Sequence, residues 1–155
     1  WRTRAPSSRR GRPGGPSPDV RVAIEPEEPR WFRRHTSRIA GEDHRWVGAS
    51  GAEGISSVAV RLAGDDDAER TYAVTLYFAE PRGLAAGERL FEVAVQGETV
   101  LRDLDVAAEA GGGDRVISRT FEGISVGGEL TVTLVPRGGS EPPVLCGIEA
   151  VAQQR

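Results

Sequence analysis

An acidic residue at the end of a predicted strand is the first place in this 155-residue chain where chemistry could occur. Glu80 closes the apolar run 76–79 directly before Pro81, where a carboxylate could catalyse a reaction or could hold a loop. A glycosidase would need a second carboxylate at a defined distance, and nothing in the sequence nominates one. The sequence leaves both roles of Glu80 open.

Two further acids, Asp103 and Asp105, are spaced so that a strand would place their side chains on one face. Such a pair could bind calcium or act as an acid pair, although a calcium site needs about six or more oxygen ligands from several segments. An aspartate at a strand end also commonly accepts hydrogen bonds from nearby backbone N–H groups. We favour this structural role.

Other catalytic and metal-binding patterns are incomplete. The segment 48–52 lacks the last glycine of a Gly-x-Ser-x-Gly nucleophile elbow, and the glycine run 111–113 has no lysine to make a phosphate loop. Cys146 lies in an apolar run, which is typical of a small buried hydrophobe. One thiol and two histidines are too few for a zinc site. We therefore expect no enzymatic activity, no metal and no cofactor.

Two tryptophans lie among charged residues and are candidates for binding. Trp31 is in the segment 29–35 and Trp46 is in the segment 42–46, both with arginines close by. Exposed indoles beside such groups suit stacking on sugar rings, with hydrogen bonds to the hydroxyls. The alternative is that both rings cap the open ends of a β-domain. Four other aromatic residues lie on apolar faces and are assigned to the core: Tyr72, Phe78, Phe91 and Phe121.

The elements that must position these residues are short strands. Apolar residues alternate with polar ones in most of the predicted strands, which cover residues 20–24, 58–62, 71–78, 90–95, 99–104, 116–121, 129–135 and 144–151. Turn-forming residues separate them, and Gln96-Gly97 predicts a tight hairpin. Helical turns are expected only at 84–88 and 106–110. The pattern predicts an all-β fold, an antiparallel β-sandwich, with alternate residues from Tyr72 to Phe78 facing one side.

The N-terminal segment differs from the rest in composition. Residues 1–18 are rich in Arg, Pro, Gly and Ser, which predicts a disordered linker to an upstream domain, and residues 19–155 form the folded domain. Residues 1–19 carry five arginines and one aspartate and are therefore basic. Residues 20–155 carry an excess of acidic residues, which makes the net charge of the whole chain −3. An acidic domain argues against nucleic-acid binding. No apolar run reaches the length of a membrane span, and a signal peptide would lie outside this fragment because it begins with Trp1.

Four stretches, taken in order, resemble the malectin family of carbohydrate-binding domains. They are a strand ending in Phe-Ala-Glu (71–80), a Phe-x-Val strand followed by Gly (87–97), an Asp-x-Asp segment (100–106) and an apolar closing strand (142–149). The resemblance covers residues 70–151. It implies a jelly-roll, galactose-binding-like sandwich whose loops at one end hold a short glucan.

The resemblance also implies which residues would meet a sugar. Ligand loops follow the Phe-Ala-Glu strand and precede the closing strand, where this chain has Arg82 and Glu141. Trp46 lies near an upstream pocket aromatic of the family, and Trp31 would form an additional wall. Two adjacent aromatics of the family's first ligand loop are replaced here by the segment 81–84. Losing two stacking contacts would weaken binding about ten- to hundredfold.

The predicted function is a secreted, non-catalytic module of the extracellular space or cell envelope, attached to a larger protein. Its partners would be an oligosaccharide or polysaccharide, by resemblance a glucan, and the covalently attached upstream domain. The alternative is a structural spacer or protein-interaction sandwich that has lost the sugar site.

Overall fold

The computed structural model describes residues 20–40, 44–62 and 68–153, so the predicted linker at 1–18 lies outside the described residues. Three short helices occur in these ranges, η1 (Thr36–Arg38), α1 (Arg45–Gly48) and α2 (Val106–Ala110). The strands of these ranges are β1 (Val22–Glu25), β2 (Arg30–Arg33), β3 (Ser50–Glu53), β4 (Ser57–Arg61), β5 (Glu69–Ala79), β6 (Leu90–Val95), β7 (Glu98–Asp105), β8 (Val116–Gly127), β9 (Glu129–Pro136), β10 (Val144–Leu145) and β11 (Gly147–Ala152).

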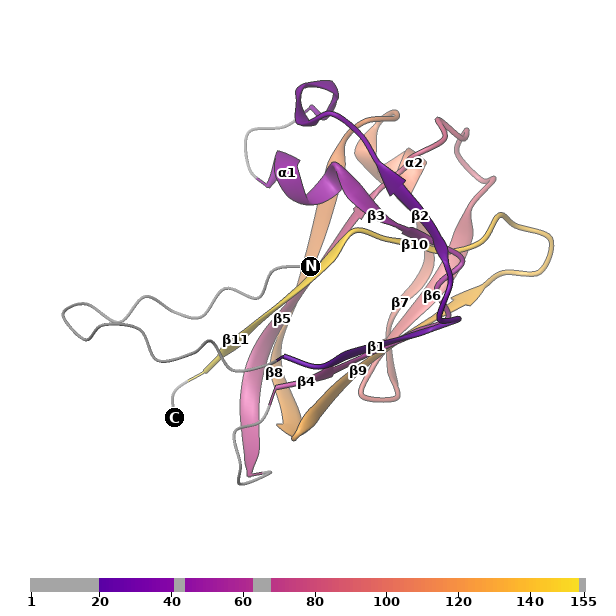
Figure 1. The fold of residues 1–155 in the computed structure, drawn as a ribbon. Coiled ribbons are helices and arrows are strands. Elements are labelled where there is room, and N and C mark those ends of the chain that lie inside the picture. Colours follow the sequence, from indigo (N-terminus) through magenta and orange to yellow (C-terminus); the bar gives the residue numbers. More distant parts are fainter. Residues whose placement is uncertain (1–19, 41–43, 63–67, 154–155) are drawn as a thin grey trace.

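The strands form three sheets in which neighbours pair antiparallel. One sheet has the order β1-β4-β9-β6-β7, the second β11-β5-β8 and the third β10-β3-β2. Figure 1 shows the third sheet across the top of the view, with α1 beside it and β1, β4 and β9 below. The predicted antiparallel β-sandwich is confirmed.

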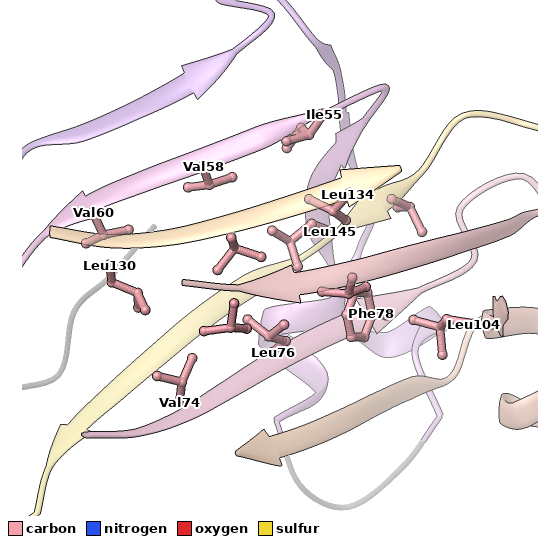
Figure 2. Packing of buried hydrophobic residues seen from close by; sticks show 14 of the residues in the cluster. Ile55, Val58, Val60, Val74, Leu76, Phe78, Leu104, Leu130, Leu134 and Leu145 are labelled. Carbon is pink, nitrogen blue, oxygen red and sulfur yellow. The ribbon is translucent and has the colours of Figure 1, made fainter. Parts of the chain in front are cut away.

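The core lies between the first two sheets and includes buried residues of the third, and β5 contributes to it through alternating apolar residues. Its inward side chains are at most 8% exposed: Tyr72, Val74, Leu76 and Phe78. They belong to one cluster with apolar residues of β4, β6 and β9 (Figure 2). The rings of Phe78 and Phe91 lie 6.0 Å apart, centroid to centroid, which links β5 to β6 across the core. The predicted facing of β5 is therefore confirmed.

A second apolar cluster, which we call the outer cluster, lies on the other face of β5. It consists of Tyr77, Ala79 and Cys146. Cys146 separates β10, which pairs with β3, from β11, which pairs with β5, so the predicted single strand 144–151 changes sheets at this residue. Burial raises the pKa of the Cys146 thiol to about 12, which keeps it protonated and unreactive, as expected of a buried hydrophobe.

Tight turns join the strands at the end of the sandwich opposite the loops discussed below. The predicted hairpin at Gln96-Gly97 is confirmed, with φ of 52° and 79° at its two residues, as a type I′ turn requires. The Gln96 side chain accepts a hydrogen bond from the backbone N–H of Thr131 at 2.8 Å and so fixes the hairpin to β9. The helical turn expected at 106–110 is α2, whereas the segment 84–88 forms a non-helical loop.

Candidate functional site

Three chain segments meet at one end of the sandwich and join through charged side chains. They are the end of β3, the β5–β6 loop and the β9–β10 loop, which lie toward the upper right of Figure 1. We call the joined side chains the arginine–glutamate network: Glu53, Glu80, Arg82, Arg89 and Glu141. The network crosses from fully buried residues to the solvent.

Arg89 forms the buried centre of the network. It is 1% exposed, and its Nε donates to Glu80 at 2.8 Å while its Nη2 donates to Glu53 at 3.0 Å. Its Nη1 donates to the carbonyl oxygen of Pro142 in the β9–β10 loop. Buried charges are tolerated only when they are paired and hydrogen-bonded, and Arg89 meets this condition with groups from all three segments.

Glu80 holds the β5–β6 loop. Its side chain is buried, accepts from Arg89 and accepts a second hydrogen bond from the backbone N–H of Arg82 at 2.8 Å. The carboxylate therefore fixes both the start and the end of the loop that carries Arg82. Of the two roles that the sequence left open, these contacts correspond to the structural one.

Arg82 and Glu141 form the solvent-facing part of the network. Arg82 Nε lies 2.9 Å from the Glu53 carboxylate, and its Nη2 donates to Glu141. This hydrogen bond lowers the pKa of Glu141, and the charges of Arg82, Arg89 and Arg30 lower it further. The same hydrogen bond raises the pKa of Arg82. The structure thus brings together two of the four residues predicted for the site.

Trp46, the third of these residues, lies on α1 at the other end of β3. It is 60% exposed, while the next residue, Val47, packs against the outer cluster. The ring of His44, which precedes α1, lies 5.1 Å from the Tyr77 ring of that cluster. Three residue steps separate Ser50, near the end of α1, from Glu53. At about 3.3 Å per step, some 10 Å of β3 lies between Trp46's helix and the network.

The pairing of β2 with β3 decides which way the fourth residue, Trp31, projects. Arg30 and Phe32 lie opposite Glu53 and Gly51, and directly opposed residues share a face. Phe32 packs against the outer cluster, as Val47 of α1 does, so this face looks toward α1 and the network. Trp31 is 54% exposed and projects from the opposite face.

The two aspartates of the Asp-x-Asp segment have local structural partners. Asp105 caps α2 by accepting from the N–H of Ala108 at 3.0 Å, and it also accepts from the N–H of Gly87 at 2.6 Å. Asp103 pairs with Arg137 at 3.0 Å. Within the described part of the chain, no three His, Cys, Asp or Glu side chains are arranged to hold a metal ion. No helix in that part has the length and apolarity needed to cross a membrane.

Comparison with known proteins finds a similar family and a similar fold. Residues 66–138 match the family model described as the malectin domain. The chain is 34% identical over 77 residues to Receptor-like protein 4 of Arabidopsis thaliana, which is 48% of this chain and 12% of that protein.

Two solved structures show the same fold at low sequence identity. The extracellular domain of ANXUR2 from Arabidopsis thaliana matches with a TM-score of 0.65 and 13% identity, over 84% of this chain and 40% of that chain. The β-glucuronidase of Bacteroides uniformis matches with a TM-score of 0.63 and 16% identity, over 82% and 14%. The chain therefore spans only a part of each protein that it resembles.

Proposed function

Because the chain contains a malectin-like domain, we propose that it is a non-catalytic module that binds an oligosaccharide or polysaccharide. The malectin domain is itself non-catalytic, although domains of this fold occur in enzymes such as the β-glucuronidase as well as in receptor ectodomains. The resemblance to the family favours a glucan as the ligand, and the segment 81–84 lacks the two adjacent aromatics of the family's first ligand loop. The proposal concerns the loop end that carries the arginine–glutamate network.

The observation that carries the proposal is the way Arg82 and Glu141 are presented. Both reach solvent, yet Arg82 is anchored by Glu53 and Glu80, which are buried and bound to Arg89. A guanidinium held in this way can donate to sugar hydroxyls without losing much conformational freedom, and Glu141 can accept from them. Trp46 lies on the same side of the third sheet and would stack on a second sugar ring.

We further propose that the module belongs to a larger protein of the extracellular space or cell envelope. The chain covers 12% of the Arabidopsis receptor-like protein and 14% of the Bacteroides β-glucuronidase, so similar domains are small parts of both. The ANXUR2 match is an extracellular domain. In this arrangement residues 1–18 would connect residues 19–155 to the upstream domain.

A glycan array with the whole chain tests sugar binding, and calorimetry on the best ligand tests the site. Trp46→Ala should weaken binding about two- to tenfold, since one stacking contact of about 0.5–1.5 kcal/mol is lost. Trp31→Ala is the matched control and tests the additional wall, since its ring projects from the other face and we expect a smaller loss. A Trp46→Ala protein with full affinity would remove Trp46 from the site, and a blank array would refute sugar binding.

The alternative is a spacer or protein-interaction domain with no sugar site. It is favoured by the fact that Arg82 and Glu141 already bind each other, so a ligand must compete with an existing ion pair. Under this alternative, substitutions in the network would lower the stability of the domain and change no binding. The glycan array separates the two functions directly.

A further inference from the structure

Within residues 20–40, 44–62 and 68–153, strand β2 is the last strand of its sheet and has one edge without a partner strand. Its sheet has the order β10-β3-β2, so β2 pairs with β3 on one side only. The N–H of Arg34 donates to the carbonyl of Ala49, which shows that Arg34 is one of the residues whose backbone groups point toward β3. In an antiparallel ladder, alternate residues point their N–H and C=O groups toward the partner strand. Phe32 therefore bonds toward β3, and the backbone groups of Trp31 and Arg33 point outward.

The open edge keeps an unbroken register, unlike two other outer strands of the sandwich. Four consecutive residue pairs join β2 to β3 without a shift. The ladders of β7 and β8 each contain register shifts, and Asp103 of β7 has a φ of 50°. Bulges of this kind twist an edge away from further pairing. The edge of β2 has no such protection.

The side chains of β2 determine which strand could pair with it. Arg30, Trp31 and Arg33 are all exposed, and two positive charges thus flank a large apolar ring. In an antiparallel pairing with β2 of a second copy, residues with outward backbone groups must lie opposite each other, and the register that sets Trp31 opposite Arg33 also sets Arg30 opposite Arg34. Like charges directly opposite each other destabilise a sheet, so this register of self-association is disfavoured.

We propose that the edge of β2 binds an extended acidic peptide segment as an added antiparallel strand. A partner with the pattern acid-x-apolar-acid places its acids opposite Arg33 and Arg30 and its apolar residue opposite Trp31. Main-chain hydrogen bonds to Trp31 and Arg33 supply affinity, and the charges supply selectivity. The acids are limited to these two positions because the exposed Glu27 and Glu28 precede β2 and repel a longer acidic run.

The test uses the whole chain and the synthetic peptide acetyl-Thr-Glu-Thr-Val-Glu-Thr-amide. The control peptide has the same sequence with both glutamates replaced by lysine. We expect the acidic peptide to bind at least tenfold more tightly, and this preference to weaken as salt is added. The double variant Arg30→Glu/Arg33→Glu should invert the preference. Equal binding of the two peptides, or no binding at millimolar concentration, would overturn the proposal.

Amide hydrogen exchange followed by NMR separates strand addition from simple charge attraction. The amides of Trp31 and Arg33 should exchange rapidly in the free protein and slowly in the complex, whereas the amide of Phe32 is protected in both. Slow exchange at Trp31 and Arg33 without peptide would show that the edge is already covered, and unchanged exchange on binding would show that no strand is added. Either result refutes the proposal. Arg33→Pro should abolish binding, because proline removes the N–H that would bond to the peptide while every bond between β2 and β3 remains. Arg33→Ala keeps this N–H and removes only the charge, so it should only weaken binding.

Discussion

The two ends of this sandwich are built by different means. At one end, short turns such as Gln96-Gly97 and Gly127-Gly128 join strands that are neighbours in sequence, and none of the charged side chains that the structure describes there is buried. At the other end, the buried Arg89 holds together segments that are 36 and 53 residues apart from it, at Glu53 and Pro142. The first end depends on backbone conformation and the second on paired charges in a low-dielectric environment.

This difference means that the end that can form from local sequence is not the end that carries the candidate site. The hairpin end can form from local sequence, because its glycines supply the positive φ values that the turns need. The loop end requires the strands to be assembled first, because each of its charges is costly to bury until its partner arrives. The end that carries Arg82 and Glu141 is thus the one made rigid by long-range contacts.

The largest effect should come from Arg89→Met, which leaves the buried Glu80 without its cation and leaves Glu53 paired with Arg82 alone. Removing one partner from a buried ion pair costs about 3–5 kcal/mol of unfolding free energy, which urea titration followed by circular dichroism would measure. If this variant does not fold, Glu80→Gln keeps the shape of the side chain and should show a smaller loss in the same direction. A loss below 1 kcal/mol in both variants would mean that the network does not hold the loop end.

A smaller effect is expected from Gly97→Ala at the hairpin end. The added methyl group meets open space, so its cost is only the left-handed backbone conformation at a φ of 79°. This strain is worth about 1–2 kcal/mol, measured by the same urea titration. A loss of unfolding free energy equal to that of Arg89→Met would contradict the proposed difference between the two ends.

Arg137→Met tests whether exposure, and not charge pairing as such, decides these energies. Arg137 pairs with Asp103 on the surface, near the same end as the network. Because solvent screens this pair, the urea midpoint should stay within the error of the measurement. A marked shift would show that surface pairs also support the loop end.

A second small effect should be a pH dependence at Glu141. Its pKa in the folded state lies below the ordinary value of 4.5, so the folded protein binds this proton more weakly than the unfolded chain does. The ion pair therefore stabilises the fold above pH 4.5, and its contribution disappears as the pH falls through the lowered pKa. The difference in Tm between wild type and Glu141→Gln should shrink over this interval. A constant difference from pH 7 to 3 would contradict the assignment.

Most of the fold could be predicted from the sequence because most strands carry an apolar alternation. The exceptions are β2 and β3, with the sequences Arg-Trp-Phe-Arg and Ser-Gly-Ala-Glu, which the alternation missed. Gly51 in β3 lies under the ring of Phe32, so a side chain there would collide with it. Pairing and close approach, which are tertiary properties, determine these two strands.

The candidate site was predictable only where a local motif marked it. The resemblance drew attention to Arg82 and Glu141, and the structure places them in contact. Nothing local distinguishes Glu53 or Arg89 from the many charged residues on the surface, because their burial follows from partners distant in sequence. The one usable signal was Glu80, an acid that directly follows a run of core residues.

The network also imposes an order in time on a chain that is made from its N-terminus. Arg89 leaves the ribosome with Glu53 and Glu80 already synthesised, whereas its third partner, the carbonyl of Pro142, is added 53 residues later. Until then the β9–β10 loop cannot close over the guanidinium, and contacts of such sequence separation form slowly. A newly made domain therefore acquires its hairpins before its loop end, and the surface that would meet a ligand is the last part to mature.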